Sequence, residues 1–218
     1  PDRVAEKGIA YMNGMKSQNV LSSAKHFPGH GNTDQDSHKV LPLIPDNKQD
    51  LEKYHIAPFK KMIAAGVQSV MVAHLNVPAL EPDPKTPSTL SKKIITDYLK
   101  GELGFRGIVI TDALNMDGVA KMFAPGEVDY RAFVAGNDIL LFSQNVKLGK
   151  QKIIEAINKG EISEVRLEES VKKILKAKYI TGLNDFKPLN PTNVFDDLNS
   201  PENLALTTKI FEKATTVV

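Results

Sequence analysis

The chain alternates short apolar runs of strand length with longer segments that have helical spacing, and this alternation constrains the fold most. The four apolar runs are VLSSAKHF (20–27), VQSVMVAHL (67–75), RGIVITDAL (106–114) and NDILLFS (137–143). No pattern typical of a β-hairpin lies between them. Strands that are connected by helices form parallel sheets, so the sequence predicts an α/β fold with a parallel sheet.

Helical spacing follows or separates these runs. The segments expected to be helical are 50–66, 89–105, 147–159, 163–180 and 204–218. Asp2 is expected to cap a further helix at the start of the chain, and Ser163 to cap the helix that follows it. Doubly wound sheets and (β/α)8 barrels both fit this pattern. A complete barrel needs about 250 residues and eight such units, so four units would form about half of one.

Composition excludes several classes of function. The 218 residues carry a formal net charge of +2 without a basic block, which gives no support for nucleic-acid binding. Cysteine is absent, so disulfides, thiolate nucleophiles and cysteine metal sites are excluded. No apolar run approaches the roughly 20 residues of a membrane-spanning helix.

Polar and titratable side chains follow the apolar runs at the point where each run ends. They are His26, His30, Asp36 and His38 for the first run, His74 for the second, Asp112 for the third, and Ser143 and Gln144 for the fourth. The carboxyl ends of parallel strands meet at one edge, where α/β proteins build their active sites. The sequence therefore predicts an active site at this edge.

Some of these residues also have simpler interpretations. Asp112 could cap a following helix, and His74 could be a core histidine bonded to backbone. The histidines and aspartate of the segment KHFPGHGNTDQDSH (25–38) could ligate a metal. They match no known zinc spacing, however, and the glycine and proline breaks would separate the side chains, so no metal site is predicted.

Asp36 and His38 are spaced for proton transfer. In an extended segment residues i and i+2 point to the same side, so this carboxylate and imidazole can hydrogen-bond. An aspartate partner fixes the tautomer of a histidine and raises its proton affinity. Asp112 would then be a second carboxylate that stays ionised. A proton donor facing an anionic nucleophile is the arrangement of a retaining glycosidase, here with histidine as the acid.

Two stretches resemble a known family. AKHFPGHGNTDQDSHKVLP (24–42), and the residues from VMVAHLNVPAL (70–80) to ITDALNM (110–116), are similar to family 3 glycoside hydrolases of the β-N-acetylhexosaminidase type. These are bacterial enzymes that remove N-acetylglucosamine from peptidoglycan fragments, and the likeness covers about residues 18–145. The family more often has aspartate where this chain has Asn32 and Ala113.

The resemblance implies a (β/α)8 barrel, of which residues 1–182 would form about the last four βα units. Residues 183–203 would be a linker, and residues 204–218 the start of a following domain or a C-terminal extension. The longer, exported members of the family resemble such a chain better than the compact cytoplasmic ones. An incomplete barrel has open strand edges, which favour self-association.

The resemblance also implies roles for individual residues. Asp112 would be the nucleophile and His38 the general acid/base, with Asp36 as its partner. The substrate-binding residues would be Lys25, His26, His74 and Met116, and Gly29 and Gly31 would be hinges of the loop that carries His38. The expected substrate is a small N-acetylglucosamine-containing glycan, and no cofactor is expected. The alternatives are a family 3 β-glucosidase or β-xylosidase, or a truncated non-catalytic fragment, and phosphorolysis could accompany hydrolysis.

Overall fold

The computed structural model describes residues 1–33, 40–188 and 190–216 of the chain. Asp36 and His38 therefore lie outside the described residues. The chain divides into two compact units, Pro1–Leu183 and Asn184–Val218. Each unit is described by itself.

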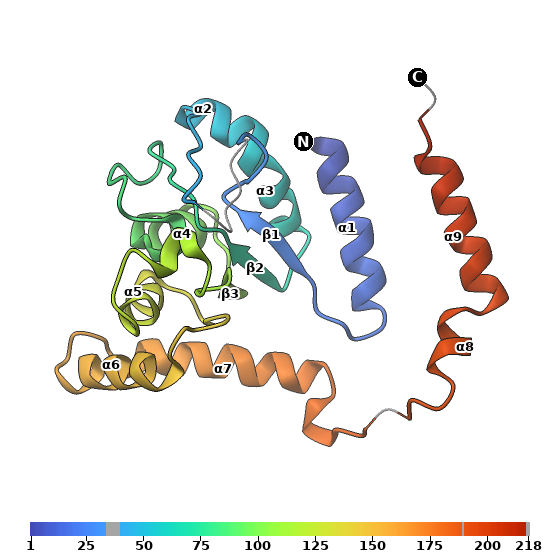
Figure 1. The fold of residues 1–218 in the computed structure, drawn as a ribbon. Helices are drawn as coiled ribbons and strands as arrows, with labels where there is room; N and C mark the ends of the chain where they lie inside the picture. Colours follow the sequence, from blue (N-terminus) through green and yellow to red (C-terminus); the bar gives the residue numbers. More distant parts are fainter. Residues whose placement is uncertain (34–39, 189, 217–218) are drawn as a thin grey trace. The chain divides into compact units, whose positions relative to one another are not determined.

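The first unit contains a parallel sheet, as the apolar runs predict. β1 (Ser23–Phe27), β2 (Ser69–Val72) and β3 (Ile108–Thr111) follow one another in this order, and each pair of neighbours is parallel (Figure 1). β1 and β2 pair with an irregularity between Ala24 and Phe27, where β1 has one more residue than β2. The α/β class is thereby confirmed.

The fourth apolar run lies parallel to β3 but forms only an isolated bridge, between Ile110 and Ile139. Its backbone still bonds β3, since the Ile139 N–H donates to the Val109 oxygen at 3.1 Å. The Val109 N–H, however, donates to the carboxylate of Asp138 at 2.9 Å. A side chain thus takes a backbone donor that a regular ladder would use, and the predicted strand is replaced by a single bridge.

Helices connect the strands and follow them. In the first unit they are α1 (Asp2–Lys16), α2 (Lys48–Asp50), the π-helix η1 (Leu51–Ile56), α3 (Ala57–Ala64), the 3₁₀ turn η2 (Ser88–Leu90), the π-helix η3 (Lys93–Glu102), α4 (Asp117–Ala120), α5 (Glu127–Ala135), α6 (Val146–Asn158) and α7 (Glu164–Ile180). The 3₁₀ turn η4 (Leu183–Asp185) crosses the boundary between the units. The second unit contains α8 (Val194–Leu198) and α9 (Pro201–Ala214), within and after the predicted linker.

Two predicted caps have different outcomes. Ser163 caps α7 by accepting a hydrogen bond from the Arg166 N–H. Asp2 is not a cap, because Pro1 takes the N-cap position and Asp2 is already helical. The Asp2 carboxylate instead accepts a hydrogen bond from Lys61 of α3 at 2.9 Å.

The core lies between one face of the sheet and the helices that cover it. The registered row Ala24, Val70 and Val109 is buried on this face, with Met12 of α1 and Phe59 of α3 in the same cluster. Figure 1 shows α3 beside β1, and α1 packs against α3. Full burial stabilises by about 1.5–3 kcal/mol for each large apolar side chain, so this face fixes the sheet firmly. The other face is different, since the registered pair Met71 and Ile110 is only half-buried.

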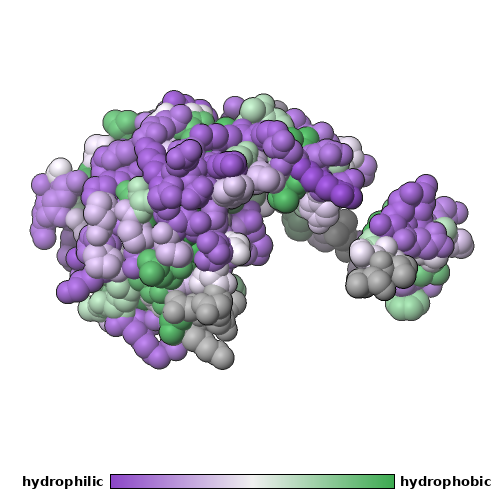
Figure 2. Space-filling model, turned by 90° about the horizontal axis from the view of Figure 1, so that it is seen from above, coloured by the Kyte–Doolittle hydropathy of each residue, from purple (hydrophilic) through white to green (hydrophobic). Residues whose placement is uncertain are grey.

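The surface carries apolar patches among hydrophilic residues, as the face in Figure 2 shows. Exposed apolar side chains of α6 and α7 include Ile154, Leu167, Val171 and Leu175. In the described part of the chain, no helix has the length and apolar character needed to cross a membrane.

Candidate active site

The carboxyl ends of β1 and β3 bring His26 and Asp112 together. The His26 Nε2 lies 3.9 Å from the Asp112 Oδ2, and the two side chains are 32% and 17% exposed. They are 86 positions apart in sequence and belong to strands that flank β2. The meeting of polar side chains at this edge follows from the parallel order of the sheet.

The Asp112 backbone and carboxylate are both held. Its N–H donates to the Val72 oxygen of β2 at 2.9 Å. Its Oδ1 accepts a hydrogen bond from the Ala113 N–H at 2.9 Å. The alternative that Asp112 caps a helix is wrong, because α4 begins at Asp117 with Met116 at its N-cap. One carboxylate oxygen is thus anchored, while Oδ2 faces His26.

His74 is completely buried beneath this edge. Its Nδ1 lies 2.6 Å from the Thr89 Oγ1, and its Nε2 lies 3.0 Å from the Ala113 oxygen. Burial lowers the pKa of His74, although the Ala113 carbonyl and the charge of Asp112 act in the opposite direction. Both ring nitrogens bond within the protein, as in the simpler interpretation of a core histidine bonded to backbone.

The segment before the undescribed residues 34–39 is fixed by packing at Gly29. Gly29 has φ +131°, and a Cβ there would lie 2.6 Å from the Cβ of His55. Only glycine adopts this conformation without strain, and only glycine leaves room for the imidazole. At Gly31 a Cβ would meet nothing within 4 Å. The predicted role of the two glycines as hinges stays a prediction.

A second interaction at this segment joins Asn32 to two residues that the sequence did not single out, Asp46 and, through it, His55. The Asn32 Nδ2 donates to the Asp46 Oδ2 at 2.8 Å. The His55 Nε2 lies 3.5 Å from the same oxygen, and the His55 side chain is only 9% exposed. In the sequence, His55 lies in the segment 50–66 that was expected to be helical, among charged residues, and nothing there marks this contact. No local pattern predicts it, because the contact depends on how the loop and η1 pack.

The remaining predicted residues lie around the edge. Lys25 is exposed on β1, and Met116 is 8% exposed at the start of α4. The peptide bonds Lys25–His26 and Phe27–Pro28 are both cis. The His30 ring lies edge-on to the His26 ring, with centroids 6.2 Å apart. No cluster of three or more potential metal ligands occurs among residues 1–33, 40–188 and 190–216.

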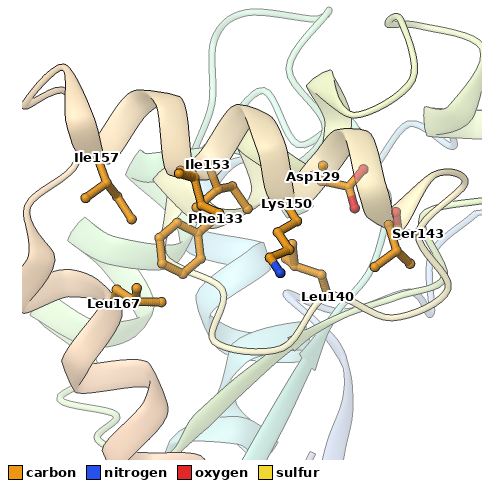
Figure 3. A pocket seen from close by; sticks show the side chains of 11 residues that line it. Asp129, Phe133, Leu140, Ser143, Lys150, Ile153, Ile157 and Leu167 are labelled. Atoms are coloured by element: carbon orange, nitrogen blue, oxygen red, sulfur yellow. The ribbon is translucent and has the colours of Figure 1, made fainter.

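An apolar groove of about 410 Å³ lies elsewhere, between α5, α6 and α7 (Figure 3). In Figure 3, Phe133, Ile153, Ile157 and Leu167 surround one part of it, and Ser143 lies toward its other end. Ser143 therefore belongs to this groove, although the sequence predicted it at the active-site edge. None of the predicted catalytic or substrate-binding residues that the structure describes lines the groove.

Comparison with known proteins identifies the class as glycoside hydrolases. A model of the "Glycosyl hydrolase family 3 N terminal domain" matches residues 1–177. This match covers most of the chain, and the chain belongs to glycosyl hydrolase family 3.

Individual proteins agree with this assignment. The chain is 32% identical over 197 residues to Beta-hexosaminidase A of Pseudoalteromonas piscicida, covering 82% of the chain and 33% of the relative. A solved family 3 beta-N-acetylglucosaminidase from Paenibacillus sp. str. FPU-7 is 37% identical with a TM-score of 0.88, covering 96% of this chain and 40% of that one. A solved beta-glucoside phosphorylase is 25% identical with a TM-score of 0.87, covering 96% and 39%. The chain thus spans less than half the length of each.

Proposed function

We propose that the protein carrying this chain is a retaining exo-glycosidase that removes terminal β-linked N-acetylglucosamine from peptidoglycan-type fragments. The observation that carries the proposal is the Asp112 carboxylate at the end of β3, with Oδ1 held by the Ala113 N–H at 2.9 Å and Oδ2 at the edge, 3.9 Å from the His26 ring. The names of the relatives support the choice of sugar.

In the first step, the Asp112 Oδ2 attacks the anomeric carbon and the bond from this carbon to the leaving oxygen breaks. His38 gives its proton to that oxygen, and Asp36 stabilises the imidazolium before transfer. The product is a glycosyl ester of Asp112. The anchored Oδ1 keeps the carboxylate in one orientation throughout, so Oδ2 is presented to the sugar.

In the second step, neutral His38 takes a proton from water, whose oxygen attacks the anomeric carbon and releases Asp112. The sugar leaves with its original anomeric configuration after two inversions. The roles of Asp36 and His38 rest on the sequence resemblance, since both residues lie outside the described part of the chain. The double displacement uses side chains only and needs no cofactor.

We assign substrate binding to Lys25 and His26 of β1, which face sugar hydroxyls, and to Met116 as an apolar wall. The sheet is proposed to be part of a (β/α)8 barrel. The half-buried pair Met71 and Ile110 supports this, because these side chains point to the face opposite the helices, where a barrel would place its interior.

The proposal is tested with Asp112→Ala in the protein expressed from its complete reading frame. Release of nitrophenol from para-nitrophenyl N-acetyl-β-glucosaminide should fall to background, because no nucleophile remains. The matched control is Asp117→Ala, whose exposed carboxylate pairs with Lys121, and it should keep wild-type activity. Mass spectrometry after treatment with a trapping fluorosugar should label the wild-type peptide that contains Asp112. Full activity of Asp112→Ala would end the proposal.

A second candidate is a β-glucosidase or a β-glucoside phosphorylase, favoured by the structural likeness to the solved phosphorylase. Parallel assays with the aryl glucoside, with and without inorganic phosphate, distinguish the candidates. A sugar phosphate as the main product would identify phosphorolysis, and a higher kcat/KM for the glucoside would replace N-acetylglucosamine as the substrate.

A further inference from the structure

The His74 ring connects the 3₁₀ turn η2 with the turn that carries Asp112. One ring nitrogen lies 2.6 Å from the Thr89 hydroxyl, and the other lies 3.0 Å from the Ala113 carbonyl. The ring is fully buried, so water cannot replace either partner. A buried polar network of this kind needs a consistent assignment of every proton.

The partners fix the position of the ring proton. The Ala113 carbonyl can only accept, so Nε2 must carry a proton. The Ala73 carbonyl, which Thr89 also approaches, already accepts a hydrogen bond from the Ser88 hydroxyl at 2.6 Å. The single Thr89 proton lies within bonding distance of both the Ala73 oxygen and Nδ1, and it goes to Nδ1 when the buried ring is neutral, since the Ser88 hydroxyl still satisfies the Ala73 oxygen. All these groups are then satisfied by a neutral ring with its proton on Nε2, and burial favours the neutral form.

The Ala113 carbonyl belongs to the residue whose N–H holds the nucleophile. The Ala113 N–H donates to the Asp112 Oδ1 at 2.9 Å, and the next N–H, that of Leu114, donates to the Leu141 oxygen at 2.9 Å. Ala113 is thus bonded on both sides of its Cα. The Ala113 carbonyl also accepts a hydrogen bond from the Met116 N–H at 3.1 Å, so loss of the bond from His74 would leave it a single donor and would loosen the turn that directs the Ala113 N–H at Asp112.

We infer that His74 is a positioning residue for the proposed reaction: its neutral ring holds the Ala113 carbonyl, and thereby keeps the Ala113 N–H directed at the anchored oxygen of Asp112. The inference rests on the proposed function for its catalytic consequence. It differs from the sequence expectation that His74 contacts the substrate, because neither nitrogen is available to a sugar.

Two amide substitutions separate the two bonds of the ring. In His74→Gln the amide nitrogen can occupy the position of Nε2 and still donate to Ala113. In His74→Asn the shorter amide can reach Thr89 but not Ala113. With the complete protein and an aryl N-acetyl-β-glucosaminide, kcat should fall about tenfold to hundredfold in His74→Asn and stay within about fivefold of wild type in His74→Gln. KM should change little in either variant.

Other kinetic outcomes would overturn the inference. Equal losses of kcat in the Gln and Asn variants would mean that the bond to Ala113 is not what matters. A raised KM with unchanged kcat would indicate a direct substrate contact. If His74 variants do not fold, Thr89→Val replaces the hydroxyl that contacts Nδ1 and the Ala73 oxygen by a methyl group and should lower kcat, while Thr89→Ser keeps the hydroxyl and should not. A Thr89→Val variant with wild-type kcat would contradict the inference.

A measurement without substrate keeps the inference distinct from the proposed function. Nitrogen-detected NMR of the histidine rings should show His74 protonated on Nε2 and not on Nδ1, with slow exchange of that proton. A ring protonated on Nδ1 would overturn the inference. If the wild-type protein hydrolyses no aryl glycoside, the proposed function fails, and the NMR result still decides the arrangement of His74.

Discussion

Replacement of Asp138 by asparagine should destabilise the first unit strongly. The Asp138 side chain is 0% exposed. Its Oδ1 accepts from the Ser170 hydroxyl at 2.6 Å, and its Oδ2 from Lys173 at 3.0 Å and from the Val109 N–H at 2.9 Å. A single carboxylate therefore connects β3, the fourth apolar run and α7.

Two further cations face the same carboxylate. The Arg166 guanidinium lies 3.4 Å from Oδ1, and the Lys100 Nζ lies 3.8 Å from it. Removing one partner of a buried charge network costs about 3–5 kcal/mol, because the remaining charges stay buried without compensation. The melting temperature should fall by roughly 6–20 °C, since about 2–4 °C corresponds to each kcal/mol in a domain of this size.

Urea denaturation followed by circular dichroism measures the loss in the free energy of unfolding. The control is Asp97→Asn, because Asp97 and its partner Lys92 are 53% and 63% exposed, and it should change stability by less than about 0.5 kcal/mol. A loss below about 1 kcal/mol for Asp138→Asn would refute the reasoning, because it would place the cations in water rather than in a buried network.

The pH dependence has a defined direction. Burial alone would raise the pKa of Asp138, but the charge of Lys100 and the hydrogen bonds from Ser170 and Val109 outweigh it and hold the pKa below 3.8. A carboxyl group with a depressed pKa in the folded state stabilises above its unfolded pKa and loses this contribution as the pH falls through the folded value. The difference between wild type and Asp138→Asn should therefore be constant near neutral pH and shrink below about pH 4.

Three further predictions concern other parts of the first unit. Asn32→Asp would place two carboxylates in contact and should speed amide hydrogen exchange in this segment. The swapped double variant Asn32→Asp/Asp46→Asn should restore slow exchange. If the double variant exchanges as fast as the single variant, the contact between residues 32 and 46 is contradicted. Gly29→Ala should lower the free energy of unfolding, measured by urea denaturation, by about 1–3 kcal/mol. Gly31→Ala, where a Cβ meets nothing within 4 Å, should lower it by less than about 0.5 kcal/mol. Equal losses in the two variants would argue against close packing at Gly29. Burial lowers the pKa of Lys100 from 10.5 to about 8. The free energy of unfolding of wild type should therefore rise from about pH 8 to pH 10.5, and that of Lys100→Met should not. Parallel curves of unfolding free energy against pH would exclude Lys100 as the cause.

The strands were predictable because their signal is local. Runs such as SVMV and IVIT are mostly apolar and rich in β-branched residues, as expected for strands of a parallel sheet that is covered by helices. The fourth run is also mainly apolar, but it forms no regular ladder with β3, because the Val109 N–H donates to the Asp138 carboxylate. A sequence pattern cannot show that a side chain from the strand's own beginning will bond the neighbouring strand. The helix α5 (Glu127–Ala135) is not among the helices that the sequence predicted.

In the candidate site, too, some features were predictable from the sequence and others were not. Asp112 and His26 could be selected because strand ends converge in any parallel sheet. The contacts of Asp46 with Asn32 and His55 could not be predicted, because they join the loop at Asn32 to η1, which is distant in the sequence. His74 was selected as a strand-end residue, but its burial depends on η2, whose Ser88 and Thr89 close over it. The position of a polar residue was thus predictable, whereas its partners were not.

The extra residue of β1 has a consequence for how this chain can change. Between Ala24 and Phe27, β1 takes three steps where β2 takes two, so Lys25 and His26 together stand opposite a single residue and both escape the core. Deleting one of them would give β1 and β2 the same number of steps between these residues, as in a regular parallel pair. Regular strand pairing therefore favours a β1 that is one residue shorter, whereas the proposed reaction favours the present length. A shortened β1 would present one polar side chain at this edge instead of two, and the proposed site would lose one of its two β1 contacts to the sugar.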